Sequence, residues 1–191
     1  TCNGTHGPGG SSDAIAGPHV VGGWPTFDGW PRFSSKTHQQ MHVDWMRRAW
    51  EGGLRVMSAL AVNNMFTATR HVVASKRQRL GVSVPTDDRA VARLQLERLT
   101  AELRRPANAS WVEIARSPRD ARRIVQSGKL AVVLGVELDL LGNFIVPGQP
   151  TGDPLRVLPA DPEAARPVIA AELDELVALG VRQITPLHYV S

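Results

Sequence analysis

Two residues with the chemistry of metal sites close predicted strands in this sequence. Glu137 ends the apolar stretch Leu130–Val136, and His188 ends a second strand-like stretch that begins at Val181. Carboxylates and imidazoles are common ligands of divalent metals, and a buried carboxylate is costly unless it is paired or binds a metal. Each position also suits a structural role: Glu137 as the partner of an arginine on a neighbouring strand, and His188 as a hydrogen-bonded strand end.

Four further polar residues lie in segments that can reach the same place. Asp139 follows Glu137 by two residues and would point to the same side if the strand continued. Asn63 and Asn64 follow another predicted strand, where they suit either hydrogen bonds to a substrate or capping of the strand. His6, in the loop CNGTHGPGG, is a candidate whose position nothing in the sequence fixes.

A third pattern, His42-Val43-Asp44, looks like a metal-binding pair but falls in a predicted helix, residues 37–50. Two residues that are two apart on a helix lie about 200° apart around its axis, so His42 and Asp44 do not converge on one ion. His38 and His42 share a helix face, as zinc-binding pairs do, but Gln39 stands where the zinc-protease pattern requires Glu. We therefore interpret the match of His42-Val43-Asp44 to a metal-binding pair as accidental.

Hydrophobic periodicity, caps and glycines predict alternating helices and strands. The predicted helices are 37–50, 87–104, 117–128 and 163–179, and the predicted strands are 54–62, 111–115, 130–137 and 181–188. Alternation without hairpin signals predicts a parallel sheet with helices outside it. The strand-to-helix connections 63–86 and 138–161 are long, which is typical of α/β folds with a site at the carboxyl ends of the strands. We expect the site just after Val62, Glu137 and Leu187.

Composition limits the classes of protein that remain. The chain has 191 residues, of which 42% are hydrophobic, so it can form one ordinary domain; residues 37–191 form that domain, after an aromatic-containing loop at 1–36. No apolar run has the roughly 20 residues that a membrane span needs. The single Cys2 excludes an internal disulfide and a zinc–thiolate cluster. The net charge is +4, but the basic residues are scattered in pairs, so nucleic-acid binding stays a remote alternative.

Two segments resemble the renal (membrane) dipeptidase family of metal-dependent hydrolases. They are KLAVVLGVELDLLGN, which contains Glu137, and ELDELVALGVRQITPLHYVS, which ends near His188. The resemblance implies an amidohydrolase-like (β/α)8 barrel, in which Glu137 bridges two zinc ions and His188 contacts the substrate. The sequence departs from the family pattern at Leu138-Asp139, at Pro186, and in a first-strand His-x-His/Asp motif that is not found.

The resemblance and the strand count lead to one expectation. A barrel of this type has eight strands and about 250 residues, whereas about four strands are predicted here. We therefore expect an α/β fold made of the parallel units of an incomplete TIM-type barrel, an internal part of a longer chain that lacks a complete site by itself. The expected activity is metal-dependent hydrolysis of amide or dipeptide-like substrates. The alternatives are a non-catalytic barrel that binds a ligand and, remotely, a basic nucleic-acid-binding protein.

Overall fold

The computed structural model describes residues 43–65, 86–149, 152 and 154–186, which fall in two separate units, Thr1–Gly53 and Leu54–Ser191. Helix α1, Val43–Glu51, belongs to the first unit. It carries Asp44 in its first turn and Arg48 in its last, as the helix dipole favours. The predicted helix is confirmed over these residues, and the predicted start at residue 37 lies outside the described part of the chain.

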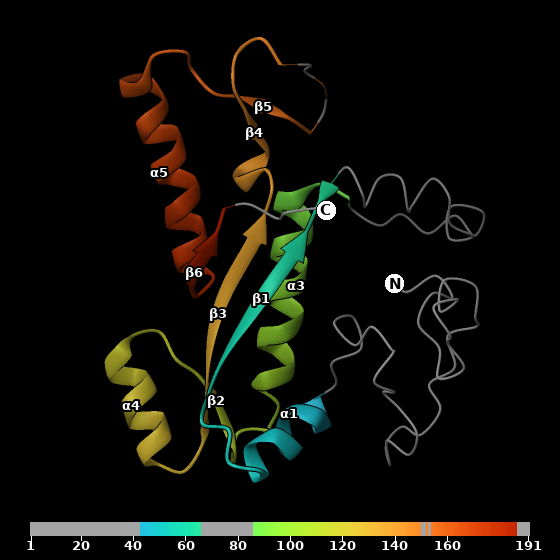
Figure 1. Cartoon of the computed structure of the whole chain (residues 1–191), viewed down its shortest axis with the longest axis vertical. Helices are drawn as coiled ribbons and strands as arrows, with labels where there is room; N and C mark the ends of the chain where they lie inside the picture. The colour runs from blue at the N-terminus through green and yellow to red at the C-terminus, as the bar shows by residue number, and fades with distance from the viewer. Residues whose placement is uncertain (1–42, 66–85, 150–151, 153, 187–191) are drawn as a thin grey trace, which may run out of the picture. The chain divides into compact units, whose positions relative to one another are not determined.

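The second unit contains a four-stranded parallel sheet, as the sequence predicts. Its strands are β1 (Val56–Asn63), β2 (Val112–Ile114), β3 (Leu130–Leu138) and β6 (Val181–Thr185). Strand β3 is the centre, because β1, β2 and β6 all pair with it in parallel. The arrows of β1 and β3 point the same way in Figure 1. Seven of the nine residues of β3 are buried, which explains why its sequence is apolar on both faces.

The order of the strands differs from the order along the chain. Strand β1 pairs with residues 131–138 on one side of β3, so the other two strands share the opposite side of β3. Strand β2 pairs with the first part of that side, residues 130–132, and β6 pairs with residues 134–137. A barrel of successive units would place its strands in chain order. The three-residue strand β2 does not follow that order, whereas β1, β3 and β6 do.

Helices lie on both faces of the sheet. Helix α4 (Pro118–Gln126) places Ile124 against Ala131 of β3. The side chains on this face of the sheet include those of Ala131, Glu113, Val133 and Glu137. Helix α3 (Asp88–Leu103) lies on the other face, where it is hydrogen-bonded to Asn63. The chain passes from β1 to β2 through α3, across β3, and returns from β2 to β3 through α4, so the two crossovers run in opposite directions across the sheet. Because such crossovers are right-handed, the two helices must lie on opposite faces.

Side-chain caps define where the helices of this unit begin. Asp87 caps α3 and accepts a hydrogen bond from Ala90 N at 2.8 Å, and Ser117 caps α4 in the same way through Asp120 N at 3.0 Å. Helix α5 (Pro162–Ala178) follows the cap Asp161, so Pro162 rather than Pro167 is its first residue. These beginnings agree with the predicted ones to within a residue or two.

The connection between β3 and α5, which is predicted to be long, contains short regular elements that the sequence pattern does not predict. It contains a short 3-10 helix, η2 (Leu141–Asn143), and two strands, β4 (Phe144–Ile145) and β5 (Arg156–Val157), which pair in parallel. Figure 1 shows this excursion beyond the arrowhead of β3. None of the helices in the described ranges has the length and hydropathy of a membrane span.

Candidate functional site at the carboxyl edge of the sheet

Glu137 lies at the carboxyl end of β3 between two parallel neighbours. It pairs with Val62 of β1 on one side and Thr185 of β6 on the other. Its side chain is half-buried and points to the face opposite α3. Because β3 and β6 run parallel, the chain leaves β6 at the edge where Glu137 sits. His188 follows Thr185 by three residues and lies outside the described residues.

Two residues before Glu137 on the same face of β3 is Gly135, which has no side chain. A Cβ at Gly135 would lie 2.5 Å from Leu60 Cδ2 and 3.0 Å from the Gln183 carbonyl oxygen, closer than such atoms approach. The bare backbone lets groups of the two outer strands meet across β3. Ser58 Oγ donates a hydrogen bond to Gln183 Oε1 at 2.8 Å. Two outer strands are thereby joined by side chains next to the candidate site.

On the other face, the end of β1 is bonded to the start of α3. Asn63 Nδ2 donates to Asp88 Oδ1 at 2.7 Å and to the Thr86 carbonyl oxygen at 2.9 Å. The second carboxylate oxygen of Asp88 accepts from Leu140 N at 2.9 Å, just beyond β3. Asp88 therefore connects the ends of β1 and β3 with the first turn of α3.

Asp88 is a carboxylate without contact with water, since its side chain is 0% exposed. Burial raises the pKa of this carboxyl above its ordinary value of 3.8, and the nearby charge of Asp139 acts in the same direction. Hydrogen bonds from Leu140, Asn63 and Met65 oppose this rise in pKa because they stabilise the ionised form. Its position at the first residue of α3 adds the favourable field of the helix N-terminus.

A second hydrogen bond joins the segments that follow β1 and β3. Asn64 Nδ2 donates to Asp139 Oδ2. Asn64 follows Asn63 directly, and Asp139 directly precedes Leu140. Asn63 points away from the face of Glu137, and both N–H groups of its amide are used within the chain. The substrate-binding roles of Asn63 and Asp139 stay predictions.

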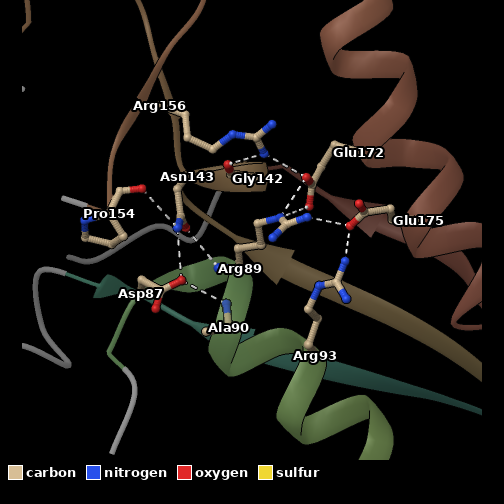
Figure 2. A network of polar contacts seen from close by, with 10 residues as sticks. All are labelled: Asp87, Arg89, Ala90, Arg93, Gly142, Asn143, Pro154, Arg156, Glu172 and Glu175. Carbon is tan, nitrogen blue, oxygen red and sulfur yellow. Dashed lines mark hydrogen bonds and ion pairs between the residues drawn. The ribbon is translucent and has the colours of Figure 1, made fainter.

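Asn143 fastens the excursion after β3 to the start of α3, as Figure 2 shows. Its Oδ1 accepts from Arg89 N at 2.9 Å, and its Nδ2 donates to Asp87 Oδ1 at 2.9 Å. Its backbone has φ 60, a left-handed conformation that asparagine tolerates well. The side chain is buried and supplies an acceptor for one of the N–H groups that every helix start leaves open.

Glu172 of α5 holds two arginines from different elements (Figure 2). It accepts from Arg89 Nε of α3 and from Arg156 Nη1 of β5, both at 2.9 Å, while being only 4% exposed. Arg156 also stacks over the ring of Phe144, with 4.4 Å to the centroid. A carboxylate this deeply buried requires such charged donors. The excursion, α3 and α5 are therefore fixed to one another above the sheet.

A separate groove of about 370 Å³ lies near the amino ends of the strands. It is lined by Arg104, Arg116 and Lys129 together with Glu113 and apolar residues of β2. Lys129 Nζ already donates to the Ala109 carbonyl oxygen at 2.7 Å. The groove is at the wrong end of the sheet to belong to the site around Glu137.

The expected zinc site is not tested by the described residues. Among them, no three His, Cys, Asp or Glu side chains are grouped so as to hold a metal ion. All six histidines of the sequence, His6 and His188 included, lie outside the described part. The pattern around His42 is divided by the same limit: Asp44 lies in α1, and His42 is not described.

The sequence reasoning missed Asp88, Asn143 and Glu172. Asp88 reads as an ordinary first-turn acid, and Glu172 lies in the charged stretch ELDEL, which suggests an exposed helix face. One signal was available: Asp87 and Asp88 stand together after a long connection, and only one of them is needed as a cap.

Comparisons of the chain with protein-family models, curated proteins and solved structures gave no match.

Proposed function

We propose that the chain belongs to a metal-dependent hydrolase of amide or peptide bonds, with its site at the carboxyl edge of the parallel sheet. Glu137 would be a metal ligand, and His188 would contact the substrate. The observation that carries this proposal is the parallel register of β3 and β6, with Glu137 opposite Thr185. A carboxylate is thereby placed at the edge of the sheet that the chain crosses on its way to His188.

The described geometry fits a carboxylate ligand in three respects. Glu137 is half-buried. It closes a strand that is otherwise apolar, and the two strands beside it are joined across Gly135 by the hydrogen bond between Ser58 and Gln183. Catalytic and binding groups of parallel α/β proteins are typically found at this edge. The finer proposal is that the four strands are successive strands of an incomplete TIM-type barrel. The order β1, β3, β6 across the sheet supports it, whereas the place of β2 does not.

In this proposal Glu137 supplies negative charge to a divalent ion, zinc being the one that the family resemblance implies. Such an ion, when bound, lowers the pKa of a water molecule so that hydroxide is available at neutral pH. His188 would donate a hydrogen bond to the substrate oxygen on which charge develops. The fixed excursion above the edge would limit access of water from that side.

The two alternatives predict different behaviour. A non-catalytic, ligand-binding barrel is favoured by the hydrogen bonds that engage Asn63, Asn64 and Asp139 within the chain. Nucleic-acid binding is disfavoured because many arginines are already paired with acids. These ion pairs are Arg47–Glu51, Arg89–Glu172, Arg93–Glu175, Arg105–Glu102, Arg123–Glu113, Arg156–Glu172 and Arg166–Glu163.

The test is the metal content of Glu137→Gln. The variant keeps the shape of the side chain and removes its charge, so we expect bound zinc to fall by at least half after dialysis. Elemental analysis measures it in the longer protein that contains this chain. Glu113→Gln is the matched control, because Glu113 lies on the same face of the sheet but near the amino ends, where it pairs with Arg123 at 2.5 Å.

Equal metal content in wild type and in Glu137→Gln would remove Glu137 from the site. A wild-type protein that binds no divalent metal and still binds a small ligand would favour the non-catalytic alternative. Steep salt dependence of nucleic-acid binding, with no metal bound, would favour the third.

A further inference from the structure

Asp88 is hydrogen-bonded to the ends of two strands. Its two carboxylate oxygens accept hydrogen bonds from Asn63 Nδ2 at 2.7 Å and Leu140 N at 2.9 Å. These donors belong to the ends of two neighbouring strands, β1 and β3, and the carboxylate lies between them. One residue further along, Asn64 and Asp139 are bonded to each other across the same two segments. The two strand ends are therefore cross-linked twice in succession.

We infer that Asp88 is a positioning residue, which holds the carboxyl ends of β1 and β3 together and so fixes Glu137 and Asp139 at the edge of the sheet. The inference deepens the proposed function and rests on it for its consequence in metal binding. Leu140 is only three residues after Glu137, and Asp139 lies between them. Loss of the Leu140 bond would let the segment that carries both carboxylates move away from β1.

Asp88 itself is not a ligand in this arrangement. Its side chain is 0% exposed, and both of its oxygens accept hydrogen bonds from the protein. Asp88 lies on the face of the sheet that α3 covers, whereas Glu137 points to the opposite face. Asp88 acts at a distance, through the backbone of the two segments. Residues that hydrogen-bond directly to a metal ligand change metal affinity by about 10- to 100-fold when they are removed, and Asp88, one step further from the ligand, should act at the lower end of that range.

Asp87 provides a matched control from the neighbouring position. It also lies at the start of α3 and also accepts from a side-chain amide, but its partners are Ala90 N and Asn143 Nδ2 rather than the strand ends. Asp88→Asn and Asp87→Asn make the same chemical change one residue apart. Both are expected to lower the stability of the fold. Only Asp88→Asn should change the position of Glu137.

The first experiment measures, by isothermal titration calorimetry, the affinity for Zn²⁺ alone of the longer protein that contains this chain. We expect Asp88→Asn to bind about tenfold more weakly than wild type or worse, and Asp87→Asn to stay within about twofold. The urea midpoints of both variants are measured alongside, so that a shared loss of stability is separated from a loss of affinity. Equal affinities for the two variants would overturn the inference.

The second experiment does not depend on metal. In Asp88→Ala both acceptors are gone, so the Leu140 amide hydrogen should exchange faster than in wild type, relative to the Leu134 amide in the middle of β3. In Asp87→Asn the ratio should be unchanged. If wild type binds no Zn²⁺, the proposed function fails, and the exchange ratio alone decides whether Asp88 positions the strand ends. An unchanged ratio in Asp88→Ala would refute it.

Discussion

Two aspartates in the first turns of successive helices differ in burial and in the direction of their pKa shift. Asp88 of α3 is buried against the ends of β1 and β3, and burial raises the pKa of its carboxyl. Asp120 of α4 is in contact with solvent, and its hydrogen bond with Arg123 lowers the pKa of its carboxyl. Both accept a backbone N–H, so the difference comes from what else reaches them. A strand end and a loop reach Asp88, whereas a flexible arginine reaches Asp120.

This difference separates a structural strut from a surface ion pair. Asp88 contacts two segments that are distant in sequence, and its removal leaves the part-buried Leu140 N–H without this acceptor and the Asn63 amide with only the Thr86 carbonyl oxygen. Asp120 contacts Arg123, three residues away on the same helix, and Arg116 N at 3.3 Å. Surface pairs of this kind contribute little because water and salt screen them. Asp88 therefore joins distant segments of the fold, whereas Asp120 joins residues of a single helix start.

The largest effect is expected for Asp88→Ala. The Leu140 N–H and the Asn63 amide lose their acceptor inside the fold, so the free energy of unfolding should fall by about 2–3 kcal/mol. Asp120→Ala should cause a much smaller loss, because water replaces the carboxylate. Urea denaturation of the two variants measures both. Similar losses would mean that Asp88 is no more than another first-turn acid.

An intermediate effect is expected at the caps, which are Asp87 for α3 and Ser117 for α4. Ser117→Ala removes one hydrogen bond, to Asp120 N, and should cost about 1 kcal/mol. Asp87→Ala removes the cap and also the acceptor for the buried amide of Asn143, so it should cost about 2 kcal/mol. Thermal or urea unfolding of the two variants tests this order. A larger loss for Ser117→Ala would contradict it.

The elements of the sheet were predictable because their signals are local. Ser117-Pro118 marks the start of α4, and the run from Leu130 marks a buried strand, whatever lies around them. The position of Glu137 at the carboxyl edge followed from the same signals, since parallel strands end at a common edge. The parallel sheet and the beginnings of its helices are confirmed, and the metal-site assignment built on them stays a proposal.

The rest was not predictable because it depends on contacts between distant segments. Asn63 and Asp88 meet at the end of β1, and Arg89 reaches Glu172 from another helix. The place of β2 at the start of β3 depends on where the longer β6 pairs, which no residue of β2 encodes. Strands β4 and β5 have two residues each, too few for a period to be recognised.

The smallest effect, and the one that separates the two aspartates by sign, is the dependence of stability on pH. The folded-state pKa of Asp88 lies above the ordinary value of 3.8, so Asp88 contributes stability that is full below that value and is lost as pH rises through the folded pKa. The folded-state pKa of Asp120 lies below 3.8, so its contribution is present above that value and is lost as pH falls through the folded pKa.

Each aspartate is therefore compared with its own asparagine variant as the solution is acidified. From neutral pH toward 3.8, wild type should gain stability relative to Asp88→Asn, because the buried carboxyl takes up a proton. Below 3.8, wild type should lose stability relative to Asp120→Asn. Urea midpoints over this pH range, repeated in about 1 M salt, measure both trends. Salt at this concentration reduces the Debye length to about 3 Å, so it should weaken the Asp120 trend and leave the Asp88 trend in place. Trends of the same sign would show that burial does not govern the titration of Asp88.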